Sequence, residues 1–164
     1  MEQDAIRRYV VDRFAGVNIS IASQESGAPE LAWGDTFFIY DPDGNLPANR
    51  QFPFATIVTK DYGDFDSASN LNRPSVFRLN IGVGKETFSK LFGLQAAPGT
   101  PSGVVDGAFD FAELDRLLPH PIYGRNHWVC VLNPSDATFE SLKPLLAEAY
   151  EIAVGRLSKA RPAG

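Results

Sequence analysis

Apolar residues recur along the chain at the spacing of one helix face in four places. The segments predicted as helices are 2–14, 85–92, 111–118 and a last helix that ends near residue 158. Gly16 is a plausible stop for the first helix. Asp110 and Glu113 resemble a capping box and mark the start of the third. Asp136 or Ser141 is expected to cap the last helix.

A second pattern, alternating or uniformly apolar runs of five to eight residues, predicts strands. These runs are 17–21, 33–40, 54–59, 76–81 and 128–132. The run 33–40 is apolar on both faces, which favours a central place in the sheet. It stops at Asp41-Pro42-Asp43-Gly44, a sequence typical of a tight turn.

The order of these elements predicts the fold class. Several strands follow one another and the helices are segregated, which is typical of an α+β domain with helices packed on an antiparallel sheet. One domain is expected over residues 1–158, with a flexible tail at 159–164. The polar segment 60–74 and the Ala-, Pro- and Gly-rich segment 94–109 are predicted as long connections, and their order is left open.

Composition and charge exclude several classes of protein. The 164 residues are 44% hydrophobic and 12% aromatic, enough for a packed core. The single cysteine, Cys130, excludes an intramolecular disulfide and suits a reducing cytosol. No secretory signal and no apolar run of membrane-spanning length is present, so a cytoplasmic protein without membrane contact is predicted. The net charge of −5 argues against nucleic acid as a partner.

One glycine-rich turn resembles a phosphate-binding loop but has a simpler interpretation. Gly82-Val83-Gly84-Lys85 lies between a strand and a helix, but Leu79 stands where a phosphate-binding loop has its first glycine and Glu86 would repel a phosphate. A tight turn is therefore expected, and no cofactor is predicted.

Both histidines and the cysteine fall within residues 120–134. A metal shared by His120 and His127 would need a third ligand from elsewhere in the chain, so no metal is predicted. His120 is interpreted as a pre-proline loop residue and His127 as a hydrogen-bonded residue at a strand start. Cys130 lies mid-strand and is interpreted as a small buried apolar residue.

The candidate binding residues come from three parts of the chain. Arg78 and Asn80 share one face of their strand, which predicts either a solvated surface or the polar floor of a cavity. Trp33 and Tyr123 are candidates for its walls. The residues predicted to bind a ligand are Trp33, Arg78, Asn80, Tyr123, Arg125 and His127. His127 and Tyr123 are the candidates for an acid or base if a reaction is catalysed.

Three stretches together resemble a family of small uncharacterised bacterial proteins, a domain of unknown function. They are WGDTFFIYDPDG, PFATIVTKD leading to RPSVFRLNIGVGKETFSKLFG, and HPIYGRNHWVCVLNP with the helix LLAEAYEIA. The last stretch is also similar to the ending of the MmcQ/YjbR family, in which His-Trp is followed by a strand and a helix. This resemblance implies an MmcQ/YjbR-like α+β sandwich, and DNA binding has been discussed for some members. It supplies no set of catalytic residues.

Three functions follow, in order of preference. The first is a cytosolic, non-enzymatic module that binds a small molecule or a protein partner near the loop 120–128. The second is an enzyme that uses His127 or Tyr123 in acid–base chemistry on a small organic substrate. The third, a DNA-binding module, conflicts with the acidic composition. Monomer and homodimer are both left open.

Overall fold

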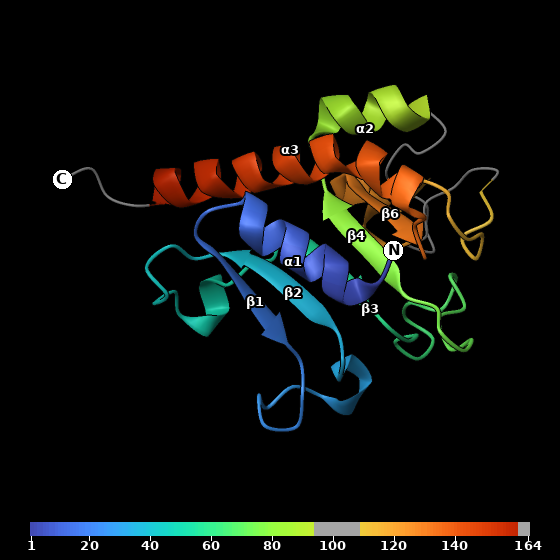
Figure 1. Ribbon diagram of the computed structural model, residues 1–164, viewed down its shortest axis with the longest axis horizontal. Coiled ribbons are helices and arrows are strands. Elements are labelled where there is room, and N and C mark those ends of the chain that lie inside the picture. The colour runs from blue at the N-terminus through green and yellow to red at the C-terminus, as the bar shows by residue number, and fades with distance from the viewer. Residues whose placement is uncertain (94–108, 161–164) are drawn as a thin grey trace.

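The computed structural model describes residues 1–93 and 109–160 (Figure 1). Within them the strands form one antiparallel sheet in the order β1-β2-β3-β4-β6-β5. The strands are β1 (Val17–Ile21), β2 (Thr36–Tyr40), β3 (Ala55–Val58), β4 (Arg78–Gly82), β5 (Leu118–Pro119) and β6 (Trp128–Leu132). The helices are α1 (Gln3–Arg13), α2 (Lys85–Phe92) and α3 (Asp136–Ala160). The predicted α+β class and antiparallel sheet are confirmed.

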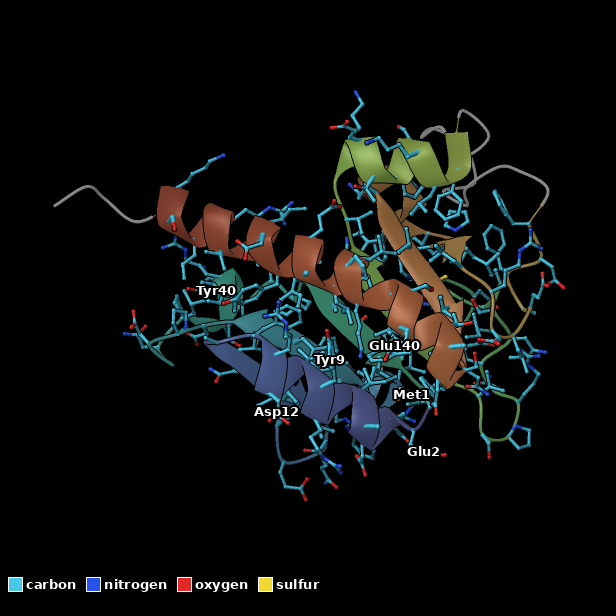
Figure 2. All side chains as sticks on the ribbon, turned by 45° about the horizontal axis from the view of Figure 1, so that its top comes forward. Met1, Glu2, Tyr9, Asp12, Tyr40 and Glu140 are labelled. Carbon is cyan, nitrogen blue, oxygen red and sulfur yellow. The ribbon has the colours of Figure 1, made fainter. Side chains whose placement is uncertain are left out.

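Two helices cover one face of the sheet. Figure 1 shows α1 and α3 running across the same face. Figure 2 shows Tyr9 of α1 on the side of that helix that faces α3, and its ring meets the ring of Phe139 edge to face at 5.3 Å. Apolar side chains from both helices and from the near face of the sheet form the core between them. They include Ile6, Val10, Phe38, Ile57, Leu79, Val131, Leu142 and Leu146. Burial of each such side chain contributes about 1.5–3 kcal/mol.

The opposite face of the sheet has a different composition. The strand register places four side chains in one row on this face. They are Phe37, Thr56, Asn80 and Cys130. The long connection 60–74 and the segment 109–127 pack over parts of this face, since side chains from both reach Arg78. This face therefore holds a cluster of buried polar groups around Arg78.

The remaining helices and strands lie within a few residues of their predicted positions. Helix α1 ends at Arg13 and the chain reverses at Gly16, where φ is 79° and a Cβ would lie 2.9 Å from the ring of Tyr40. Only glycine fits there. The segment 60–74 has no helix or named strand, as expected. The expected connection at 94–109 and the end of the tail fall, apart from residue 109, outside the described residues.

The predicted helix 111–118 is wrong. Asp110 does begin a turn, since its Oδ1 accepts a hydrogen bond from the amide of Ala112 at 3.0 Å. The turn is not continued, because the backbone then pairs with β6. Asp115 donates its amide hydrogen to the Leu132 carbonyl at 2.7 Å, and Leu118 and Pro119 form β5 on the same strand edge. Covering that edge satisfies the β6 backbone groups, which a short isolated helix would leave unpaired.

The cap of the last helix also differs from the prediction. The residue before α3 is Ser135, whose Oγ accepts a hydrogen bond from the Thr138 amide at 3.2 Å. Neither Asp136 nor Ser141 is the cap, because both lie inside the helix. Pro144 falls inside α3 as well, beyond the first turn. No helix in the described part of the chain has the length and apolar character needed to cross a membrane.

Candidate functional site

A cavity of about 530 Å³ opens on the sheet face opposite α1, and Arg156 of α3 contributes to its lining. We call it the aromatic cavity. Its walls carry the rings of Phe37, Phe52, Tyr62, Phe65, Tyr123 and Trp128. Its polar floor consists of Thr56, Asp66, Arg78, Asn80 and His120. Apolar walls around a few converging polar groups are the usual form of a small-molecule site.

The floor is organised around Arg78, whose side chain is completely buried. Its Nη1 and Nη2 donate to the two carboxylate oxygens of Asp66 at 3.1 and 2.6 Å. Its Nη1 also donates to Ser69 Oγ at 2.8 Å, and its Nε donates to Asn80 Oδ1 at 2.8 Å. A buried guanidinium needs such a complete set of partners, because an unpaired charge in this position would cost several kcal/mol.

A short relay of hydrogen bonds leads from Arg78 across the sheet. Asn80 accepts from Arg78 and donates through Nδ2 to Thr56 Oγ1 at 3.0 Å. Among the described residues Thr56 donates its own hydroxyl hydrogen to no protein group. Because Thr56 lines the cavity, this hydrogen is available to an acceptor atom of a ligand.

His120 forms the other end of the floor and is held in one protonation state. Its Nδ1 accepts hydrogen bonds from the amides of Ile122 and Tyr123 at 3.0 and 2.9 Å. A neutral ring with an accepting Nδ1 carries its proton on Nε2. Burial, and then the charge of Arg78, hold the pKa of His120 well below its ordinary value.

The other ring nitrogen of His120, Nε2, faces Arg78. It lies 3.1 Å from Arg78 Nη2, and the donor and acceptor roles in this contact depend on the tautomer of the ring. Both side chains line the aromatic cavity. The Thr56 hydroxyl is the floor donor that has no protein acceptor among the described residues.

Asp35 holds the side chain of Tyr62, which forms part of the wall of the aromatic cavity. This buried carboxylate accepts hydrogen bonds from the Thr59 amide at 2.9 Å, from Thr59 Oγ1 at 3.1 Å and from the hydroxyl of Tyr62. Burial raises the pKa of Asp35. Burial and the hydrogen bond to Asp35 also raise the pKa of Tyr62, so its hydroxyl stays protonated and its ring is anchored at the cavity wall.

The structure brings three of the six predicted ligand-binding residues together. Arg78 and Asn80 form the floor, and Tyr123, which is 44% exposed, lies at the mouth with its ring 5.0 Å from that of His120. Trp33 lies elsewhere and donates its indole N–H to the Ala28 carbonyl at 2.9 Å. Arg125 is exposed and does not line the cavity.

The sixth predicted residue, His127, lies away from the aromatic cavity. It adopts a left-handed backbone conformation with φ of 69°, just before β6. Its ring packs against Phe88 of α2, with the ring centroids 5.7 Å apart. His120 therefore takes the position beside the cavity, and the two histidines have different neighbours.

Three residues of the floor, Thr56, Asp66 and His120, were not among the predicted site residues. Asp66 belongs to the polar segment 60–74, which shows no period, and His120 reads as an ordinary pre-proline residue. One signal was available in the sequence. Arg78 is a charged residue between the apolar Phe77 and Leu79, and a buried arginine requires an acidic partner.

The turn at Gly82–Lys85 holds a carboxylate of the protein itself. Glu148 accepts hydrogen bonds from the Gly84 amide at 2.8 Å and from Thr87 Oγ1 at 2.5 Å. It thereby occupies the N-terminal end of α2, where a phosphate would otherwise bind. Among the described residues no three His, Cys, Asp or Glu side chains come together as metal ligands.

The fold and site define an α+β protein in which helices α1 and α3 pack on one face of the sheet. An aromatic cavity lies over a buried Arg78–Asp66 ion pair on the other face. The chain belongs to DUF6194, a family of unknown function, whose model matches residues 1–162. The predicted resemblance to a domain of unknown function is confirmed at this level. No curated protein and no solved structure matches the chain.

Proposed function

We propose that the protein is a small-molecule binding module whose ligand occupies the aromatic cavity. The observation that carries the proposal is the pairing of aromatic walls with a floor of polar groups that includes the Thr56 hydroxyl, whose hydrogen has no protein acceptor among the described residues. Aromatic walls bind a flat apolar body, and donors at one end orient it by its acceptor atoms. The ligand expected is a planar aromatic molecule with a carbonyl or carboxylate oxygen at its edge.

Exposed aromatic rings at the mouth support the same conclusion. Phe52, Phe65 and Tyr123 are 71%, 60% and 44% exposed. The rings of Phe65 and Tyr123 lie 6.4 Å apart. Large apolar side chains gathered at one opening are typical of binding sites, because their exposure to water is unfavourable until a ligand covers them.

Fewer observations support an enzymatic role than support the binding role. Of the two predicted acid–base residues, Tyr123 lies at the cavity and His127 packs against Phe88.

We further infer a cytosolic location, supported by the lone reduced Cys130. Kinship with the MmcQ/YjbR family also belongs to the proposal. Its support is the order of His127-Trp128, strand β6 and helix α3.

The proposal is tested by thermal-shift screening against a library of planar aromatic compounds, followed by calorimetry on the compounds that bind. Binding should be lost in the double variant Phe65→Ala/Tyr123→Ala, which removes two mouth rings that are exposed and not needed for the core. Leu31→Ala is the matched control, since Leu31 is 50% exposed and lies outside the cavity. A library without any binder, or binders that the double variant keeps, would overturn the proposal.

A further inference from the structure

A second cavity, of about 250 Å³, lies between the C-terminal half of α3, the segment 46–54 and the end of β4. We call it the arginine cavity. Tyr40, which Figure 2 places beneath the C-terminal half of α3, contributes to its wall. Arg50 and Arg156 both line it, and no acidic residue does. Within the described part of the chain neither arginine forms an ion pair.

This concentration of positive charge contrasts with the net charge of the whole chain, which is −5. Two guanidinium groups at one cavity repel each other unless an anion lies between them. Guanidinium groups bind carboxylate and phosphate oxygens in a two-pronged geometry, so a small anionic group is the matching occupant.

The two cavities adjoin. Phe52, Pro53, Trp128 and Arg156 line both of them. The Trp128 indole lies against Gly82, where an added Cβ would come within 3.0 Å of the ring. Among the described residues its N–H donates to no protein group, and so it is free to meet a ligand that passes between the cavities.

We infer that the ligand is an aromatic anion. Its planar body lies in the aromatic cavity, and its carboxylate or phosphate group lies in the arginine cavity between Arg50 and Arg156. This inference rests on the proposed function and adds the charge of the ligand to it. The acceptor oxygen on the aromatic body meets the Thr56 hydroxyl, whereas the anionic group meets the two arginines.

A matched series of probes, each with a methoxy oxygen on the ring as acceptor, tests the inference: 6-methoxy-2-naphthylacetate, 6-methoxy-2-naphthyl phosphate and the neutral 6-methoxy-2-naphthylacetamide. Dissociation constants are measured by calorimetry at low and high salt. The better of the two anions should bind at least about tenfold tighter than the amide, and added salt should reduce that advantage. Whether the carboxylate or the phosphate is tighter identifies the anionic group, and either result supports the inference.

Variants of the arginines locate the effect. Arg50→Gln, whose side chain lines the arginine cavity but not the aromatic cavity, should reduce the advantage of the anions and leave the amide affinity within about threefold. Arg8→Gln, on the exposed side of α1, gives the same change of net charge and should keep the advantage. Anions and amide that bind the native protein equally would overturn this inference but not the proposed function. Failure of all three probes, or binding that survives Phe65→Ala/Tyr123→Ala, would count against both.

Discussion

Arg78 and Asp66 form a two-pronged ion pair beneath the aromatic cavity, with Nη2 and Oδ2 2.6 Å apart. Arg78 lies in β4, whereas Asp66 lies in the connection 60–74, twelve positions earlier. The pair therefore ties an irregular segment to the centre of the sheet. A buried pair of this kind adds little net stability, but loss of one partner leaves an uncompensated charge.

Asp66→Asn is expected to lower the free energy of unfolding by about 3–5 kcal/mol, because the Arg78 charge would remain buried beside a neutral amide. Urea denaturation measures the change. Asp64→Asn is the control, since Asp64 lies in the same segment and is exposed, and it should change stability by less than about 0.5 kcal/mol. If Asp66→Asn prevents folding, Ser69→Ala is the milder variant, with an expected loss of about 1–3 kcal/mol. Equal stabilities of all these variants and the native protein would contradict the role of the pair.

His120 should make stability depend on pH just below neutrality. Burial holds the pKa of His120 in the folded state well below the ordinary 6.5. As the pH falls below 6.5, His120 is therefore protonated in the unfolded chain but stays neutral in the folded protein. Stability is therefore retained above pH 6.5 and lost as the pH falls. The expected loss between pH 7.0 and 5.5 is on the order of 1 kcal/mol.

The measurement is urea denaturation at both pH values. His120→Asn keeps an acceptor for the Ile122 and Tyr123 amides and should remove this part of the pH dependence. His127→Asn tolerates the left-handed backbone and keeps His120, so it should behave like the native protein. A pH dependence that His120→Asn leaves intact would show that His120 is not its source.

The thiol of Cys130 is expected to be unreactive in the folded protein. Burial raises the pKa of its thiol to about 12, and its Sγ lies 3.7 Å from the Pro119 carbonyl. Ellman's reagent at pH 8 should therefore react only as fast as the chain unfolds, and at once in concentrated urea. Rapid labelling in native buffer would place the thiol at the surface and contradict the strand register.

Gly82→Ala and Gly155→Ala should have opposite effects. At Gly82 a Cβ would lie 3.0 Å from the Trp128 ring, so the indole must move, at an expected cost of about 1–3 kcal/mol. The displacement also changes the wall shared by the two cavities. At Gly155, within α3, a Cβ meets nothing within 4 Å, and alanine should add about 0.5–1 kcal/mol. Denaturation of both variants, with tryptophan fluorescence for Gly82→Ala, checks the prediction. A neutral Gly82→Ala would show that the indole is not held against β4.

Local periodicity determined the greater part of the fold. The helix at 2–14 and the five apolar runs follow from side-chain spacing, which the chain carries without reference to distant residues. The same alternation placed Arg78 and Asn80 on one face of a strand. It left open whether that face met water or enclosed a cavity, since polar side chains at alternate positions are compatible with both.

Tertiary structure decided what covers that face. The connection 60–74 has no period of its own. The backbone of its Asp66 pairs with Tyr62, and the Asp66 carboxylate binds the distant charge of Arg78. Residues 111–118 have a helical pattern, yet Leu118 and Pro119 form a strand because they pair with the backbone of β6. His120 is carried with them to the cavity floor. Spacing specifies which side of an element is apolar, but the conformations of long connections depend on the hydrogen bonds and charges they meet after the sheet has formed. The sequence pattern alone therefore specified five of the six strands and their apolar faces, whereas tertiary structure decided β5, the strand order and the site.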